Sequence, residues 1–370
     1  MRWLCSCGST SALCPRTFSG ESIIGRPNIQ IRRIKIRLII ICCRNLIVGS
    51  SANGPCDKAA GNETFRYAVF SCDTPDGTGH RKFDYAFYLP LTALAWERIG
   101  FKSIVVIIGK RADWTGNAIL NHVLEALEWR SAVVMFVDAA PKNRRMLSQT
   151  VRLFVANMNE WAERDDYLIT SDSDLWPLRQ AHFTPEVDKS LVLVHSDCCD
   201  NFNFQNKSYR MLPMCNIGAN ASTWRQLMNY NQSIATDSET ILKYFEEKFG
   251  PVVNEEVTFA SDNWYLDQKM ISIRIQEWIE RHSDQSVARK SDWGYARIDR
   301  LRWTPERIPL SMFSHYYDAH MPEHGYDPAT WTSIRPLVKR MYGNTWRMRW
   351  CDKYAREFYS KLINSTNQSL

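Results

Sequence analysis

The chain has 370 residues, of which 45% are hydrophobic and 14 are Trp, so it is long enough to bury a sizeable core. Its net charge of +6 is concentrated at the amino end: residues 1–44 hold eight Arg or Lys and one acid, and residues 45–370 carry a net charge of −1. A near-neutral body lacks the basic face that binding to a phosphate backbone requires, so we expect no nucleic-acid partner.

We interpret residues 1–64 as a basic tail with a candidate signal anchor at about 36–49, followed by a stem. The basic cluster Ile31–Arg37 precedes an apolar run, Leu38–Val48, which Arg44 interrupts. This order is typical of a signal peptide or a type II anchor whose positive side stays in the cytosol. The run is shorter than the roughly 20 apolar residues that span a bilayer, so a leader without a membrane role is the alternative.

Six N-x-S/T sites follow the basic segment: Asn62, Asn206, Asn220, Asn231, Asn364 and Asn367. Oligosaccharide is attached to such sites only in the secretory lumen, so they favour a Golgi or ER membrane protein with a lumenal body, or a secreted protein. We expect Asn220 to lie too close to the active site for modification. Candidates for disulfides or buried thiols are Cys56, Cys72, Cys198, Cys199, Cys215 and Cys351.

From about Phe65 short apolar runs alternate with longer amphipathic stretches, which predicts an α/β domain with a mostly parallel sheet flanked by helices. The expected strands are Tyr67–Cys72, Ser103–Ile108, Val133–Val137, Tyr167–Thr170, Leu191–His195 and Met211–Gly218. The expected helices are Tyr85–Ile99, Ala118–Trp129, Met146–Trp161, Ala221–Met228, Ser238–Phe249 and Asp262–Ile279. The last ninety residues show few clear periods, and we expect them to wrap the working edge of the sheet. Residues 65–370 are thus interpreted as one catalytic domain.

Asp172 and Asp174 follow the apolar strand Tyr167–Thr170 directly. Ligands of open α/β sheets bind at the carboxyl ends of strands, and two acids at i and i+2 can face one cation there. Oxygen ligands suit Mn²⁺ or Mg²⁺, which can bridge the oxygens of a diphosphate. A solvated turn that happens to carry two acids is the alternative.

The order of apolar strand, D-x-D, Asn-x-Gly junction and later Trp-Tyr-Leu-Asp-Gln resembles that of GT-A fold glycosyltransferases, the nucleotide-diphospho-sugar transferases that include glycogenin-like enzymes. The resemblance covers roughly Arg66 to Tyr326 and assigns no subfamily. It implies a GT-A-like, Rossmann-like sheet, a nucleotide-sugar donor with a UDP-sugar favoured, and a glycan or glycoprotein acceptor.

The resemblance also implies site residues. Asp172 and Asp174 would be the metal motif, and Asp172 would also belong to the donor site. The other residues implied for the donor site are Ser71, Asp73, Thr74, Arg152, Asn216 and Gly218. Arg152 could equally be a solvent-facing helix residue, and a glycine such as Gly218 could serve an ordinary turn rather than close approach of a ligand.

The segment Asp262–Gln268 supplies a second acidic site. Asp262 could cap the following helix, and Asp267 is then expected beyond the first turn, facing the transferred sugar or the acceptor hydroxyl. If the reaction inverts the anomeric centre, Asp267 acts as general base; if it retains, Asp267 and Gln268 orient the sugar. A plain surface acid is the alternative. For the third metal ligand we favour His320, then His315, although neither matches the His-x-x-Gly-x-Lys pattern of the family.

Other D-x-D enzymes fit less well. In phosphatases of the haloacid dehalogenase type the motif lies on the first strand, and a nucleotidyltransferase needs a Gly-rich phosphate loop that Asp76–Lys82 matches only faintly. The remaining rival is a catalytically inactive, secreted or membrane-tethered glycan-binding protein with the same fold.

Overall fold

The computed structural model describes residues 64–75, 83–158, 165–230, 236–258, 261, 263–290 and 296–367. All of them belong to one unit, residues 62–370. Residues 1–63, with the predicted anchor, lie outside this description, as do Asp262, Asn62, Asn231 and Cys56.

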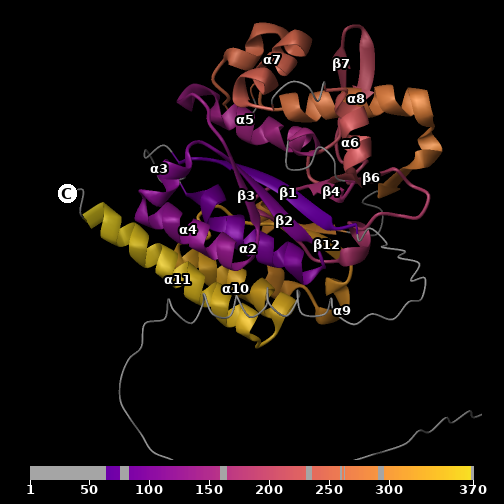
Figure 1. Ribbon diagram of the computed structural model, residues 1–370. Helices are drawn as coiled ribbons and strands as arrows, with labels where there is room; N and C mark the ends of the chain where they lie inside the picture. The colour runs from indigo at the N-terminus through magenta and orange to yellow at the C-terminus, as the bar shows by residue number, and fades with distance from the viewer. Residues whose placement is uncertain are drawn as a thin grey trace, which may run out of the picture. The chain divides into compact units, whose positions relative to one another are not determined.

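A seven-stranded sheet forms the centre of this unit, with the strand order β10-β6-β9-β4-β1-β2-β3 (Figure 1). Its strands are β1 (Arg66–Asp73), β2 (Lys102–Ile108), β3 (Val133–Val137), β4 (Tyr167–Thr170), β6 (Leu191–Val194), β9 (Ile217–Asn220) and β10 (Val287–Lys290). Strand β9 runs antiparallel to β4 and β6, and the other neighbours are parallel. The predicted α/β architecture, a mostly parallel central sheet flanked by helices, is confirmed.

Helices cover both faces of the sheet (Figure 1). One face packs against α2 (Asp84–Arg98), α4 (Ala118–Trp129), α10 (Pro328–Tyr342) and α11 (Trp346–Asn367); the other packs against α5 (Arg144–Thr150), the 3₁₀-helix η2 (Val151–Asn157), α6 (Ala221–Met228), α7 (Ser238–Phe249) and α8 (Leu266–His282). Side chains of β1 alternate between the two cores: Ala68, Phe70 and Cys72 enter the first, and Tyr67 and Val69 the second. Successive side chains of a strand point to opposite faces of the sheet, so a strand that is buried on both faces must be apolar at every position.

Two smaller sheets and two short helices complete the described unit. One sheet joins β11 (Ala296–Ile298), β12 (Tyr316–His320) and β5 (Leu175–Pro177), and the other is the hairpin β7 (Asn201–Phe204) and β8 (Lys207–Arg210). The short helices are α3 (Arg111–Thr115) and α9 (Leu310–Phe313). Gln205 and Asn206, with φ of 48° and 60°, form the two-residue hairpin turn, where positive φ at both positions matches the twist of the strands. In the described part of the chain no helix has both the length and the apolar character that crossing a bilayer requires.

The first four predicted strands match β1 to β4 within a residue or two, whereas three later expectations are wrong. The strand expected at Met211–Gly218 begins only at Ile217, because the backbone before it bonds to side chains instead of to the backbone of a neighbouring strand. Ser272 Oγ accepts from Leu212 N, and Thr170 Oγ1 donates to Met214 O. The helix expected at Met146–Trp161 tightens to a 3₁₀-helix from Val151.

The carboxyl-terminal region is the third correction. Within the last ninety residues, Arg300 and His320 do lie at the working edge beside Asp174, whereas residues 328–367 form the two long helices α10 and α11 on one face of the sheet. Met348, Cys351, Tyr354, Ala355 and Phe358 follow helical spacing into the core. The interleaved Arg and Trp residues had hidden this period.

Gly218 of β9 lies under the ring of Tyr167 of β4, and a Cβ atom there would overlap the Tyr167 hydroxyl and come within 2.7 Å of its Cζ atom. Packing against Tyr167 therefore explains this glycine, which corrects the idea that it lets a ligand approach.

We expect Gly218→Ala to lower the free energy of unfolding by about 1–3 kcal/mol through overpacking. Tyr167→Phe should raise it by about 1 kcal/mol, because the buried Tyr167 hydroxyl has no hydrogen-bond partner within the described residues. Urea denaturation of both variants and of the double variant checks this; if Tyr167→Phe recovers none of the loss in the double variant, the overlap is not the cause.

Candidate active site

The predicted acids lie at the carboxyl end of a central strand. Strand β4 is flanked by β1 and β9, and the loop Ser171–Asp174 leads from it into β5. Two side chains of helix α2 bind this loop. Thr92 Oγ1 donates to the carbonyl of Ser173, and Trp96 Nε1 donates to Ser171 Oγ at 3.3 Å. Leu175 N and Met321 N bond to the carbonyls of Asp172 and Asp174. The carboxylates are thus presented from a fixed loop at the sheet edge, and a freely solvated turn is excluded.

Arg152 connects the two acidic segments. It lies in η2 and is 7% exposed, so the solvent-facing alternative is wrong. Its Nη1 atom donates to Asp172 Oδ1 at 2.5 Å and to the Ser171 carbonyl at 2.8 Å, and its Nη2 atom contacts Asp267 Oδ2 at 3.2 Å. Asp172 and Asp267, 95 residues apart in the sequence, therefore share one buried guanidinium.

Burial raises the pKa of both acids and the shared cation lowers it, but the net shifts of the two pKa values are opposite. Burial alone would raise the pKa of Asp172, but the contact with Arg152 leaves it below its ordinary value. Burial raises the pKa of Asp267 to about 6 in spite of Arg152. One carboxylate is thus held ionised, and the other titrates in the range expected of a group that exchanges protons near neutral pH.

Asp267 is the second residue of α8, which starts at Leu266 and not at Asp262. The expectation that it lies beyond the first turn is therefore wrong. Its Oδ1 atom accepts the backbone N–H of Gln268 at 2.8 Å, a typical contact of an acid at a helix amino end. At 4% exposure it is not a surface acid either.

Asp174 meets His320 and Arg300. Strand β12 pairs with β5 so that His320 lies opposite Leu175, beside the acid. His320 Nε2 is 3.6 Å and Arg300 Nη2 is 2.7 Å from Asp174 Oδ2. His315 is exposed and precedes β12 at its far end, about 16 Å away along an extended strand, so His315 cannot be the third ligand.

Within the described residues no three His, Cys, Asp or Glu side chains are grouped as a metal cage. The pair Asp174 and His320 nevertheless fits a divalent cation, since their 3.6 Å separation is one that a single ion can span. Ions of the Mg²⁺ type are commonly held by one or two carboxylates, with waters and substrate phosphates as the other ligands. Asp172 is held by Arg152 through its Oδ1 atom.

The side chains predicted for the donor site at the end of β1 are bound to the rest of the fold to different degrees. Ser71 Oγ donates to the carbonyl of Ser148, and Asp73 is half-buried at the strand end. Thr74 is buried, and its hydroxyl donates to the Ile108 carbonyl and accepts from Trp114 Nε1. The Thr74 hydroxyl is therefore used by packing, which corrects its assignment to the donor site.

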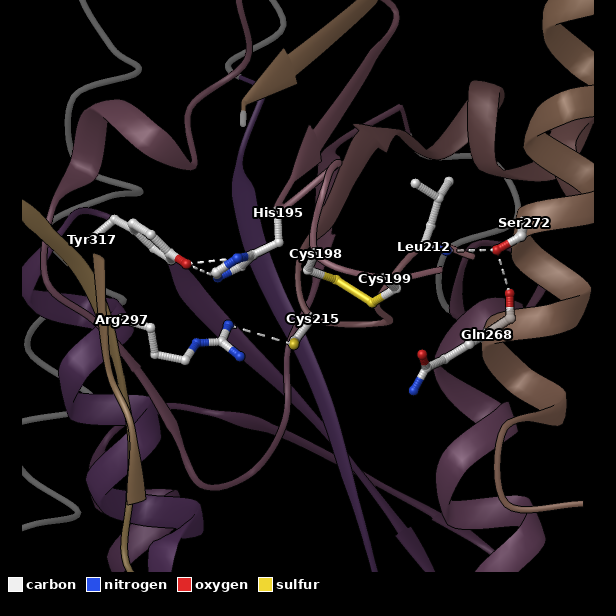
Figure 2. Close-up of a disulfide and its surroundings, with 9 residues drawn as sticks. All are labelled: His195, Cys198, Cys199, Leu212, Cys215, Gln268, Ser272, Arg297 and Tyr317. Atoms are coloured by element: carbon white, nitrogen blue, oxygen red, sulfur yellow. Dashed lines mark hydrogen bonds between the residues drawn. A yellow bond between two sulfur atoms is a disulfide. The ribbon is translucent and has the colours of Figure 1, made fainter. Parts of the chain in front are cut away.

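Asn216 and Gln268 border the acids. Asn216 is fully buried and donates from Nδ2 to the Thr170 carbonyl at 3.0 Å; its Oδ1 atom has no partner among the described residues. Gln268 is half-buried on α8, and its side chain extends toward the side on which the Cys198–Cys199 disulfide lies (Figure 2). Both residues therefore lie near the acids. Asn216 holds the end of β4 through its bond to Thr170, and the Gln268 side chain is partly exposed to solvent.

Two arginines that the sequence did not single out complete the site. Arg300 pairs with Asp174, and Arg297 makes a two-pronged ion pair with the buried Asp318, at 2.8 and 2.7 Å, while also contacting Cys215 (Figure 2). Arg297 and Arg300 come from a stretch without regular period, so no sequence signal could have placed them beside Asp172 and Asp174.

The cysteine and glycosylation predictions have mixed outcomes. Cys198 and Cys199 form a disulfide with each other, whereas Cys72, Cys215 and Cys351 are buried thiols. Asn220 is exposed and pairs with Tyr167 at the start of β4. It therefore lies at the edge of the sheet opposite the acids, and the expectation that it is close to the active site is wrong.

One pocket of about 460 Å³ lies at the same sheet edge beyond β2 and β3. It is lined by Lys110, Asp138, Ala139, Ala140, Pro141, Arg144 and Ser238. It contains none of the predicted site residues.

The raised pKa of Asp267 makes stability depend on pH. The folded protein binds more protons than the unfolded chain between the ordinary value of 3.8 and about 6, so this group lowers the free energy of unfolding as pH rises through that window. Asp267→Asn removes the effect. Between pH 4 and 7 we therefore expect the variant to gain up to about 3 kcal/mol relative to wild type in urea unfolding. An equal difference at both pH values, for example 4.5 and 7, would contradict the buried-acid assignment.

No protein-family model and no curated protein matches the chain. Solved structures do: one is described as a glycosyltransferase involved in the glycosylation of the major capsid of PBCV-1, with 8% identity and a TM-score of 0.32, covering 69% of this chain and 93% of that one. Another is 4-diphosphocytidyl-2C-methyl-D-erythritol synthase, with 12% identity and a TM-score of 0.26, covering 56% of this chain and 100% of that one. Both likenesses are too weak to carry the functional argument, which rests on the geometry of the acids.

Proposed function

We propose that the chain is a metal-dependent glycosyltransferase that transfers a sugar from a nucleotide-sugar donor to a glycan or glycoprotein acceptor. The observation that carries the proposal is the convergence, at the carboxyl edge of one mostly parallel sheet, of Asp174 with His320 and of Asp172 with Asp267 through Arg152. Acids from separate segments, held at the place where α/β sheets bind ligands, can hold a divalent cation that a diphosphate substrate shares.

Asp174 and His320 would hold Mn²⁺ or Mg²⁺, which supplies Lewis-acid stabilisation of the charge that develops on the diphosphate leaving group. Arg152 keeps Asp172 ionised and fixed beside that position. Ser71 and Asp73, at the end of the neighbouring strand β1, adjoin the space in which the nucleoside would lie. These residues orient the donor and balance its charge.

Asp267 faces the sugar end of the site in this proposal. With a pKa of about 6 it is mostly ionised at pH 7 and basic enough to accept a proton from an acceptor hydroxyl. That role applies if the reaction inverts the anomeric centre; in a retaining reaction the same carboxylate and Gln268 orient the sugar. Proton NMR of the first-formed product distinguishes the two outcomes.

A glycan-binding protein without turnover is the second candidate, and one observation favours it: Arg152 and Arg300 already neutralise Asp172 and Asp174. The same acids would then serve the fold alone. Nucleotide binding separates the two functions.

We expect UDP to raise the melting temperature of the wild-type protein only when Mn²⁺ is present. Ligand at a hundred times its Kd adds about 2.7 kcal/mol to the free energy of unfolding. Asp174→Asn should lose both this shift and the hydrolysis of UDP-sugars, because the remaining partner His320 cannot hold the ion alone. Thermal melts with UDP or GDP and a donor panel read by nucleotide release provide the measurements.

The matched control is Asp188→Asn, which removes the same charge from an exposed residue before the start of β6. It should behave as wild type. Metal-dependent stabilisation by UDP that survives in Asp174→Asn would refute the assignment.

We also propose that the body faces the lumen of the Golgi or ER, held by the anchor at about 36–49, or is secreted. Asn206 in the β7–β8 turn, Asn220 and Asn364 are all exposed, as an acceptor site must be.

Enzymatic removal of N-glycans from protein made in eukaryotic cells should therefore increase its mobility on a denaturing gel. Asn206→Gln should run faster than wild type before that treatment and identically after it. Equal mobility of treated and untreated protein would place the body outside the lumen.

A further inference from the structure

We propose that Arg300 is a built-in competitor of the metal ion: it holds Asp174 and His320 while the site is empty and passes to the donor diphosphate when the ion binds. The inference rests on the proposed function and concerns how its metal site is regulated. Two contacts carry it, because Arg300 reaches both side chains that would bind the ion. Its Nη2 is 2.7 Å from Asp174 Oδ2 and its Nε is 3.3 Å from His320 Nδ1.

The contact with His320 decides which ring nitrogen carries the hydrogen. A guanidinium only donates, so Nδ1 must accept the Arg300 Nε–H. The neutral ring then carries its hydrogen on Nε2, the nitrogen 3.6 Å from Asp174 Oδ2. A nitrogen that bears hydrogen offers no lone pair, so in this state Nε2 cannot bind a metal.

The neighbouring residue offers the alternative partner. Asp299 Oδ2 is 3.9 Å from His320 Nδ1, just beyond hydrogen-bond range. Histidine ligands generally donate their second ring N–H to a carboxylate, which fixes the orientation of the ring. If Arg300 moves away, the ring can lose the Nε2 hydrogen to water and take one from water at Nδ1. The new Nδ1–H then faces Asp299, and Nε2 is free for the ion. Asp299 and Arg300, on one short turn, thus stabilise opposite states of one imidazole.

Charge balance explains where Arg300 goes. When a divalent cation occupies the Asp174 carboxylate, the guanidinium loses its partner and is repelled by the ion. A diphosphate that shares the ion brings negative charge to the same place and forms strong paired hydrogen bonds with Arg. A metal ion that binds alone must therefore break the ion pair between Arg300 and Asp174 without replacing it. When metal and diphosphate bind together, the diphosphate becomes the new partner of Arg300. Arg300 thereby makes the binding of metal and donor mutually dependent.

The test compares Arg300→Gln with Arg302→Gln in the full chain. Both remove one positive charge from the same turn, but the exposed side chain of Arg302 has no hydrogen bond or ion pair within the described part of the chain. Binding of Mn²⁺ alone, followed by electron paramagnetic resonance of the free ion, should be about tenfold tighter in Arg300→Gln than in Arg302→Gln. Binding of UDP at saturating Mn²⁺, followed by calorimetry, should be about tenfold weaker. Asp299→Asn should weaken Mn²⁺ binding about tenfold.

A second measurement, made without metal, tests the position of the ring hydrogen of His320. Nitrogen-15 NMR of labelled histidine, with His320 assigned by His320→Gln, should show hydrogen on Nε2 in wild type and on Nδ1 in Arg300→Gln. If Arg300→Gln fails to fold, Arg300→Lys serves, since an ammonium can hold Asp174 without also donating to His320 Nδ1; the ring hydrogen should move in the same way.

Equal Mn²⁺ affinities in Arg300→Gln and Arg302→Gln, or an unchanged ring hydrogen, overturn the role of Arg300. If wild type still binds UDP in a Mn²⁺-dependent manner, the proposed function survives that result. Wild type that binds neither Mn²⁺ nor UDP overturns both.

Discussion

One buried guanidinium holds the candidate site together. Arg152 lies where η2, the end of β4 and the start of α8 meet, and it contacts an acid from each of the latter two segments. A buried cation without partners would cost several kcal/mol, so Arg152 requires both Asp172 and Asp267, and their loops must stay where it can reach them. The same contact lowers the pKa of the Asp172 carboxyl below its ordinary value, although partial burial acts to raise it.

The site is also neutralised from the carboxyl-terminal part of the chain. Arg300 pairs with Asp174, and Arg297 pairs with Asp318 next to Cys215. Ionised acids that lie close together repel each other, and these arginines reduce that repulsion in the free protein. In the proposed function, binding of the metal and the donor would therefore be an exchange of ionic partners at Asp174.

Several expectations were wrong because a residue of the right type was already used by packing. The hydroxyl of Thr74 bonds to Ile108 and Trp114, and Gly218 makes room for Tyr167. His315 fails for another reason, because it precedes β12 at the end far from Asp174. A motif specifies which side chains are present, but not what each one meets in the folded chain. Only the contacts show whether its polar atoms are still available.

The sequence by itself determined the alternation of strands and helices and the place of Asp172 and Asp174 at a strand end, because the period of apolar residues along a segment reports its local conformation and its buried face. Tertiary structure alone decided that Arg152 joins Asp172 to Asp267, that His320 and not His315 faces Asp174, and that Arg300 lies between them. These pairings depend on strand order and on the register of β12 against β5. They join segments up to 146 residues apart, and no local pattern encodes such a contact.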